Sequence, residues 1–203
     1  RDSNKSFVND GKIEFFEDDL CDLNACLRAC NNIDIVFHCA SKVGSISFYK
    51  NNASKVLSHN ILLDTQILSA AQDTGVSCFI YISSAYVYPI ERMQDSFGSA
   101  IKESEAIPAN PAITYGWAKL MGEIALQHVV ENGNKLNGMI LRLSNFYGPH
   151  QSIDLDRGSI IPVLIRRALE YSKSSPFYIR GSGNETRTYC YISDIVDAIL
   201  LAV

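Results

Sequence analysis

The chain has 203 residues, of which 47% are hydrophobic and 20% charged, and its formal net charge is -4 at pH 7. This composition is typical of a globular protein and argues against a disordered, collagen-like or coiled-coil chain. The negative charge and the dispersed Lys and Arg residues argue against nucleic acid as a partner. Because no apolar run approaches the ~18 residues that span a bilayer and the N-terminus is polar, we expect no membrane partner and a cytoplasmic location.

The cysteines and histidines give no sign of a metal site. Six cysteines and four histidines are dispersed along the sequence without a Cys-x-x-Cys pair. Several of the cysteines lie inside apolar runs, as reduced core thiols do. We therefore expect neither a disulfide framework nor a bound metal.

Short apolar segments alternate with longer helical patterns, which is typical of βαβ units and a parallel sheet. We expect strands at residues 13–16, 33–40, 78–83, 138–143 and 177–179. Helices are expected at residues 20–30, 53–73, 110–132 and 160–171, with a loop at 89–111 and a strand-to-helix unit at 189–203. The near-continuous apolarity of 33–40 predicts a strand with helices covering both faces of its sheet.

These elements predict an α/β protein with an open, doubly wound parallel sheet, which is a Rossmann-like fold. Ligands bind to such sheets at the carboxyl ends of the strands. Small, polar or acidic residues follow the predicted strands, namely Asp18-Asp19-Leu20, Ala40-Ser41-Lys42, Ser83-Ser84-Ala85 and Ser144-Asn145. We expect a ligand site at this edge of the sheet.

Ser84, Tyr115 and Lys119 form a candidate catalytic set. Tyr115 and Lys119 are four residues apart on a predicted helix, so both project from one face. A tyrosine, with a pKa of about 10 in water, acts as a base near neutrality only if a nearby cation such as Lys119 stabilises the phenolate. Ser84 would hydrogen-bond the substrate hydroxyl, so that a proton and a hydride leave together. The alternative is that Tyr-x-x-x-Lys is a pair on the helix surface.

Six motifs occur in the order found in one enzyme family: Asp18–Asp22, His38–Ser41, Ile82–Tyr88, Tyr115–Lys119, Arg142–Pro149 and Gly181–Arg187. With these motifs the chain resembles the extended short-chain dehydrogenase/reductase family, and in particular its NAD-dependent nucleotide-sugar epimerases and dehydratases. The resemblance covers essentially the whole chain. It implies NAD as the cofactor, with NADP possible, and a nucleoside-diphosphate sugar as the substrate.

The resemblance also implies roles for individual residues. Asp19 and Leu20 would hold the adenine, and the dinucleotide would further contact Cys39, Ala40, Ser41, Ser83, Tyr115 and Lys119. Asn145 and Arg187 would bind the substrate diphosphate, for which a guanidinium fork is well suited. The alternative for Arg187 is a solvated surface residue. Ser84 would contact the sugar, and Tyr86 would either shape the substrate site or serve as packing.

Within the family, the motifs are most similar to those of GDP-L-fucose synthase and GDP-mannose 3,5-epimerase. The chain differs from both enzymes because Tyr86 and Ser159 stand where they carry a cysteine and a His or Lys. The acidic pair of the dehydratases is replaced by Ala85-Tyr86. The remaining redox set suffices for an epimerase that removes a hydride from a sugar carbon and returns it through a keto intermediate. The alternatives are a dehydratase or reductase of the family, or a catalytically idle fragment.

The resemblance further implies that residues 1–150 form a partial dinucleotide-binding domain and residues 151–203 part of a smaller substrate-binding lobe. The glycine-rich turn of the family would precede Arg1, so we expect this chain by itself to bind NAD weakly or not at all. Helices 53–73 and 110–132 carry more apolar surface than one sheet contact needs. We expect them to form a homodimer by packing into a four-helix bundle.

Overall fold

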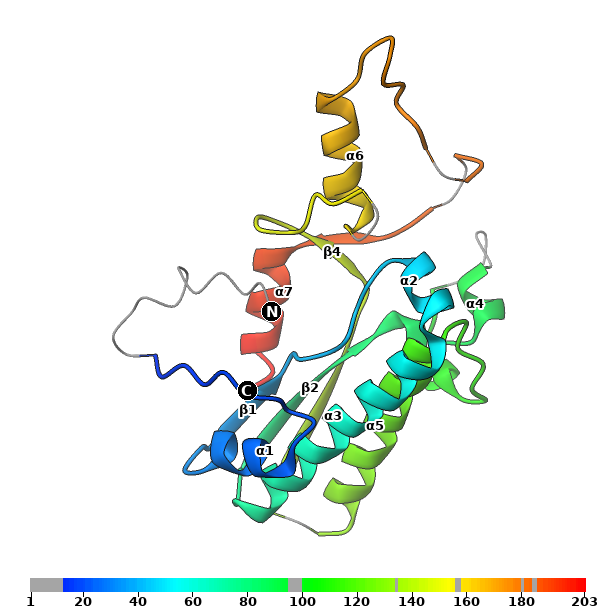
Figure 1. Cartoon of the computed structure of the whole chain (residues 1–203). Helices are drawn as coiled ribbons and strands as arrows, with labels where there is room; N and C mark the ends of the chain where they lie inside the picture. Colours follow the sequence, from blue (N-terminus) through cyan, green and yellow to red (C-terminus); the bar gives the residue numbers. More distant parts are fainter. Residues whose placement is uncertain (1–12, 95–99, 134, 156–157, 180, 184–185) are drawn as a thin grey trace.

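The fold is built on a parallel three-stranded sheet (Figure 1). The computed structural model describes residues 13–94, 100–133, 135–155, 158–179, 181–183 and 186–203. The strands are β1 (Ile35–His38), β2 (Cys78–Ser84) and β3 (Asn137–Leu143), in the order β1-β2-β3. The register pairs Phe37 with Ile80, and Ile80 with Met139. All three strands therefore end at the same edge, as the α/β prediction requires.

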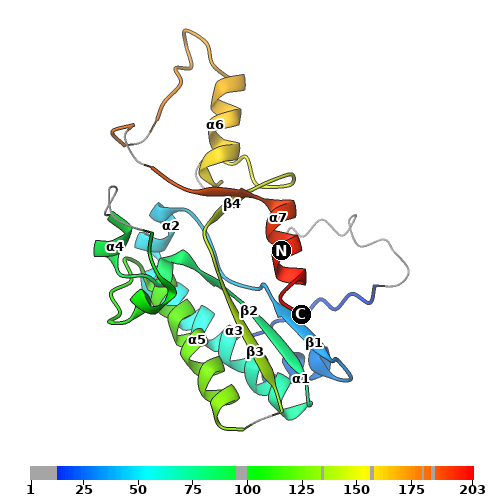
Figure 2. The same ribbon diagram turned by 180° about the vertical axis from the view of Figure 1, so that it is seen from behind.

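Three helices cover one face of this sheet: α1 (Leu23–Cys30), α3 (Ala53–Asp73) and α5 (Thr114–Glu131) (Figures 1 and 2). Alternate side chains of β2, Phe79 and Tyr81, enter a core that includes Ile67 of α3 and Leu126 of α5. Full burial of an apolar side chain of this size stabilises a fold by roughly 1.5–3 kcal/mol. This layer fixes α3 and α5 relative to β2, and the candidate site is built on these elements.

The opposite face of the sheet is open in the described part of the chain. Ile35 and Phe37 of β1 and Met139 of β3 are 37%, 40% and 38% exposed. The prediction that strand 33–40 is covered on both faces is therefore wrong for the described residues, since the helices packed on the sheet lie on one side (Figure 2). Ile80 is buried on this open face because it lies in the central strand between Phe37 and Met139.

A second, two-stranded parallel sheet lies beyond the carboxyl end of the first (Figure 1). Its strands are β4 (Asn145–Tyr147) and β5 (Tyr189–Tyr191), which pair Asn145 with Tyr189. Helix α6 (Ile160–Leu169) lies between them in the sequence, and α7 (Ile192–Leu200) follows β5 directly. The pairing of β4 with β5 thus brings segments that are far apart in the sequence together next to the end of β3.

Most predicted elements are found with shifted ends. The helix predicted at 20–30 begins at Leu23, because Asp22 caps it by accepting from the Asn24 amide at 3.0 Å. The helix predicted from 110 begins at Thr114, since Pro111 forms an extended bridge with Pro89. The predicted loop 89–111 contains two short helical segments, α4 (Ile90–Gln94) and η3 (Glu103–Ala106). Two more short helical segments, α2 (Ile46–Asn51) and η2 (Ala85–Val87), precede this loop.

Two predicted strands, 13–16 and 177–179, are wrong. Ile13 and Phe16 are 54% and 56% exposed and, like Phe177–Ile179, do not pair with any described strand. An apolar run without a neighbouring strand cannot form a ladder. Strand β4 was missing from the prediction because it has three residues and follows β3 after Ser144.

Candidate active site

Helix α5 carries Tyr115 and Lys119 toward the end of β2. Their exposures are 9% and 1%, so the alternative of a surface pair is wrong. The start of α5 is tied to the start of α3, because the Thr114 hydroxyl donates to the Ala53 carbonyl at 2.9 Å. A Cβ atom at Gly116 would lie 2.1 Å from the Tyr86 carbonyl oxygen. Glycine at this position therefore lets the first turn of α5 lie against the segment that follows β2.

Ser84 lies at the carboxyl end of β2 and meets Tyr115. Its hydroxyl accepts from the Tyr86 amide at 3.3 Å and thereby caps η2. Burial raises the pKa of Tyr115 to about 12, while side-chain hydrogen bonds with Ser41 and Ser84 act in the opposite direction. Tyr115 is a neutral phenol near pH 7 here.

The Lys119 ammonium faces α3 rather than solvent. Its Nζ lies 3.7 Å from Asp64 Oδ1 and 4.6 Å from the centre of the Tyr81 ring. Burial lowers the pKa of Lys119, and the Asp64 carboxylate opposes this effect. An ion pair in a buried environment holds its partners in place more firmly than one at the surface.

Asn60 and Asp64 are site residues that sequence reasoning missed. Both project from α3 into the core. Asn60 Oδ1 accepts from the Ser41 hydroxyl at 3.1 Å and from the Lys42 amide at 2.7 Å, and its Nδ2 donates to the Lys42 carbonyl at 3.2 Å. These bonds fix the loop after β1. The sequence does carry a signal for Asn60 and Asp64. They follow Val56 at steps of four residues and so lie on the apolar stripe of α3, where a polar residue needs a buried partner.

Glu123 was also missed, and it explains the orientation of Ser83. The Ser83 hydroxyl donates to Glu123 Oε1, and both side chains are buried. Arg142 of β3 binds the same carboxylate, with Nη2 2.7 Å from Oε2. The side chain of Ser83, predicted to contact the cofactor, is therefore directed into the layer between β2 and α5.

The predicted adenine end lies at the start of α1. Asp19 is exposed, Leu20 is half-buried, and the Asp19 carboxylate accepts from the Cys21 amide at 3.0 Å. Asp19 and Lys42 line a common hollow of about 380 Å³ that also includes His59. From Lys42 the chain leads back through Ser41, which influences the pKa of Tyr115, to Ala40 and then Cys39, which influences the pKa of Lys119.

These residues fit an elongated dinucleotide along the carboxyl edge of the sheet. A carboxylate stands at one end, where an adenine amino group needs an acceptor. An ammonium, a phenol and a hydroxyl stand at the other end, where ribose hydroxyls and a reacting alcohol need polar partners. The donor set therefore has the chemistry that the cofactor assignment requires.

Of the two predicted diphosphate ligands, Asn145 lies on the second sheet and Arg187 lies in the segment just before β5. Asn145 begins β4, and its Nδ2 donates to the Thr188 carbonyl at 3.3 Å, which places it beside the segment of Arg187. The ring of Tyr86 meets that of Tyr115 edge-on, with centres 6.2 Å apart. Burial raises the pKa of Tyr86, and the charge of Arg187 lowers it. Tyr86 thus packs against Tyr115 and is close enough to the exposed Arg187 to be influenced by its charge.

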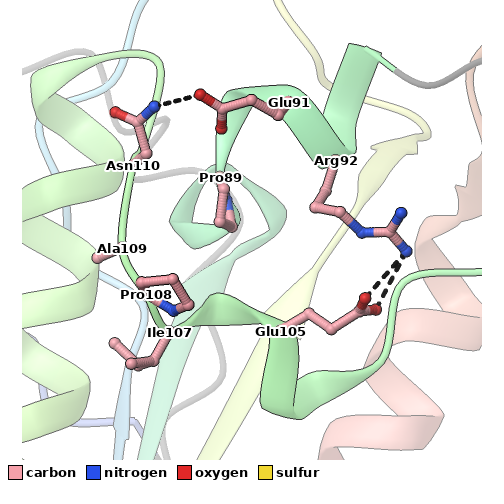
Figure 3. A pocket seen from close by; sticks show the side chains of 8 residues that line it. All are labelled: Pro89, Glu91, Arg92, Glu105, Ile107, Pro108, Ala109 and Asn110. Atoms are coloured by element: carbon pink, nitrogen blue, oxygen red, sulfur yellow. Dashed lines mark hydrogen bonds and ion pairs between the residues drawn. The ribbon is translucent and has the colours of Figure 1, made fainter.

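A separate hollow of about 450 Å³ is lined by Pro89, Glu91, Arg92, Glu105, Ile107, Pro108, Ala109 and Asn110 (Figure 3). Its charged side chains bind one another: Arg92 pairs with Glu105 at 3.0 Å, and Asn110 donates to Glu91. None of the predicted catalytic residues contributes to its lining. Its polar groups lock the 89–110 segment together.

The described residues contain neither a metal-binding cluster nor a membrane-spanning helix. No group of three or more His, Cys, Asp or Glu side chains is arranged there to hold a metal ion. No helix in the same part of the chain is long and apolar enough to cross a membrane. All six cysteines are free thiols, and Cys26 and Cys30 are buried as predicted for core thiols.

Comparisons with known proteins give one family. The model of the family described as "NAD dependent epimerase/dehydratase family" matches residues 1–203. GDP-mannose 3,5-epimerase 1 of Oryza sativa subsp. indica is 32% identical over 187 residues, covering 92% of this chain and 48% of that protein. The dTDP-D-glucose 4,6-dehydratase of Homo sapiens is 32% identical over 200 residues, covering 97% and 52%.

Among solved structures, UDP-glucuronic acid 4-epimerase from Bacillus cereus, in complex with UDP-glucuronic acid and NAD, matches with a TM-score of 0.78. It is 28% identical, and the match covers 98% of this chain and 58% of that one. The chain spans about half the length of the curated relatives it matches.

Proposed function

The chain belongs to the NAD-dependent epimerase/dehydratase family, and we propose that it carries the redox centre of a nucleotide-sugar epimerase. The observation that carries this proposal is the joint burial of Tyr115 and Lys119 on one face of α5, with the Ser84 side chain at the end of β2 close enough to influence the Tyr115 phenol. This is the arrangement in which a sugar hydroxyl at Ser84 could pass its proton to Tyr115.

The proposed step oxidises a secondary alcohol of the sugar to a ketone. The Tyr115 phenolate takes the hydroxyl proton, and Ser84 bonds the sugar oxygen and aligns it with Tyr115. When bound, NAD would supply the acceptor for the hydride from the same carbon and the donor for its return to the opposite face. In the return step Tyr115 gives the proton back, so the sugar is inverted without net oxidation.

The state of Tyr115 in this structure suits the second half of that cycle. With its pKa raised to about 12 by burial, the phenol is protonated near neutral pH. To act as a base it needs positive charge close by, and Lys119 is the cation one helical turn away. Lys119 would also hold the ribose hydroxyls of the cofactor, and the adenine would lie at Asp19 and Leu20. NADP is the alternative cofactor.

The proposed substrate class is the nucleoside-diphosphate sugars. The bond from Asn145 to the Thr188 carbonyl supports a role for Asn145 and the neighbouring Arg187, since a guanidinium with an amide suits a diphosphate. Tyr86, between Tyr115 and Arg187, would restrict the sugar. Relatives named for GDP-, dTDP- and UDP-sugars support the class without selecting one base.

Two further reactions of the family are the alternatives. A dehydratase is supported by the relative named as a dTDP-D-glucose 4,6-dehydratase, but Ala85 and Tyr86 supply no acid pair for loss of water. A reductase needs only the redox set. A catalytically idle fragment is the third alternative.

The location of the protein in the cytoplasm is a separate prediction.

We also propose a homodimer through α3 and α5. Both helices carry large apolar side chains on the surface: Leu62 of α3 is 42% exposed, and Trp117 and Met121 of α5 are 38% and 47% exposed. Four such helices packed as a bundle would remove these side chains from water.

The test is product analysis on a panel of UDP-, GDP- and dTDP-hexoses, each incubated with the protein and followed by proton NMR. NAD is supplied in large excess, because we expect this chain by itself to bind the cofactor weakly. Inversion of one sugar carbon is the expected result. Loss of water or net reduction would replace the epimerase assignment by one of the alternatives. Calorimetric titration with NAD separates the idle fragment: no heat and no thermal shift would reject cofactor binding by this polypeptide.

A further inference from the structure

Asp64 is a buried carboxylate to which the proposed function has assigned no role. It lies on α3 with 3% exposure, and three side chains from three other elements surround it. His38 Nε2 at the end of β1 lies 2.7 Å from Oδ1, the Tyr81 hydroxyl of β2 donates to Oδ2 at 2.6 Å, and Lys119 Nζ of α5 lies 3.7 Å from Oδ1.

Burial makes these groups depend on one another. A charged group removed from water is tolerated only when it is paired and hydrogen-bonded. The Asp64 carboxylate has two lone pairs on each oxygen, and donors from His38, Tyr81 and Lys119 reach it. Lys119 is 1% exposed. Among the described residues, the Asp64 carboxylate is its counter-ion within 4 Å.

The packing around this cluster leaves room for it. A Cβ atom at Gly122 would lie 2.2 Å from the Tyr81 hydroxyl and 3.2 Å from Asp64 Oδ2. Replacing Gly122 by any residue with a Cβ atom would therefore displace the Tyr81 hydroxyl from Asp64. The His38 and Tyr81 rings stack with centres 5.8 Å apart, which fixes the directions of two of the three donors.

We propose that Asp64 is a positioning residue for the redox step: it holds the Lys119 ammonium at a fixed place beside the site and keeps it charged. The effect on turnover rests on the proposed function. The pairing of Asp64 with Lys119 does not, because it is a property of the folded chain. His38 and Tyr81 orient the carboxylate, and Asp64 does not touch substrate in this account.

The charges that act on Lys119 come from each element packed around it. The titratable groups are Asp64 of α3, His38 and Cys39 at the end of β1, Tyr81 of β2, and Tyr115 and Glu123 of α5. Asp64 is the largest of the influences that favour the charged form of Lys119, and burial opposes it. Removing the Asp64 charge leaves burial as the dominant influence.

The test is an NMR titration of Lys119 in protein labelled with ¹³C at lysine Cε, comparing wild type with Asp64→Asn. We expect the pKa of Lys119 to fall by at least about one unit in Asp64→Asn, because a buried ammonium without its counter-ion is disfavoured. Asp73→Asn is the matched control, since it makes the same change at an exposed position of α3, and it should leave the titration unchanged. An unaltered Lys119 titration in folded Asp64→Asn overturns the proposal.

A reciprocal variant covers the case in which Asp64→Asn does not fold. In Lys119→Met the buried Asp64 carboxylate loses its cation, so the free energy of unfolding near pH 7 should fall below that of wild type. A free energy of unfolding equal to that of wild type overturns the proposal. Turnover supplies a separate readout: in Asp64→Asn its alkaline limb should move to lower pH by the shift measured for Lys119. A Lys119 shift in a protein that turns over no nucleotide sugar upholds the Asp64 pairing and rejects the proposed function.

Discussion

Glu123 and Arg142 form an ion pair across the layer between α5 and β3, with Arg142 Nε 3.0 Å from Oε1 and Nη2 2.7 Å from Oε2. The same guanidinium donates from Nη1 to the Glu103 carbonyl at 2.6 Å, which ties η3 to the sheet. Glu123 follows Lys119 by four residues, as Lys119 follows Tyr115. One buried face of α5 therefore carries the proposed base, its cation and the carboxylate that anchors the helix.

Glu123→Gln should destabilise the fold because it leaves the Arg142 guanidinium without its counter-ion. Breaking one side of a buried pair costs about 3 kcal/mol. Urea denaturation measures the free energy of unfolding. Glu131→Gln on the same helix is the control, since Glu131 is exposed and its ion pair with His128 lies at the surface, and it should change stability little. Equal effects of the two variants would contradict the anchoring role.

Gly122→Ala should lower stability even though alanine favours a helix. The new Cβ would lie 2.2 Å from the Tyr81 hydroxyl, so the Tyr81 bond to Asp64 must break or α5 must shift. Overpacking of this kind costs about 1–3 kcal/mol. Thermal or urea unfolding measures the loss. In Gly122→Ala with Tyr81→Phe the clash is smaller, so the double variant should lose less than the sum of the single variants.

Stability should fall as the pH rises from about 10 to about 12. Burial raises the pKa of Tyr115 to about 12 in the folded chain, above its ordinary value of about 10 in the unfolded chain. The unfolded chain therefore loses this proton first, so the contribution of Tyr115 is complete below pH 10 and disappears as the pH rises through the folded value. Urea titrations from pH 9 to 11 measure the slope.

Tyr115→Phe supplies the control for that pH dependence. Phenylalanine does not titrate, so the variant should lose stability less steeply over this range. The remaining slope has contributions from Tyr49, Tyr81 and Tyr86, whose pKa values burial also raises. Identical slopes in wild type and variant would contradict the buried phenol.

Met121→Glu should weaken the proposed dimer by placing a charge on the exposed apolar face of α5. Sedimentation velocity at micromolar concentration measures the association state. Leu169→Glu is the control, because Leu169 is also exposed but lies on α6. A wild-type protein that sediments as a monomer would reject the dimer.

The parallel sheet and its long helices could be predicted because local patterns specify them. The apolar stripe of α3 runs from Ala53 to Asp73, and Gly75 after it adopts a φ of 79°, which glycine reaches without strain. Strand β4 could not be predicted in this way. It pairs with β5, which lies more than forty residues further on, and such a pairing leaves little trace in a segment of three residues.

The proposed catalytic residues could be picked out from the sequence, but the residues that support them could not. Tyr115 and Lys119 were accessible from their spacing of four and from the order of the motifs. Asp64 belongs to the support because it contacts residues from three other elements, and its significance depends on packing that a sequence pattern does not specify. The elevated pKa of Tyr115 has the same origin, since burial outweighs the hydrogen bonds that favour the phenolate.

The central claim is that Tyr115 exchanges a proton with a sugar hydroxyl while a hydride moves to NAD. Tyr115→Phe keeps the ring that stacks on Tyr49, with centres 5.4 Å apart, so the fold should be retained. The most direct measurement compares the rate at which wild type and Tyr115→Phe convert the nucleotide sugar identified by product analysis. We predict a loss of at least about 100-fold in the variant, with an unchanged melting temperature. Full turnover by Tyr115→Phe would contradict the account.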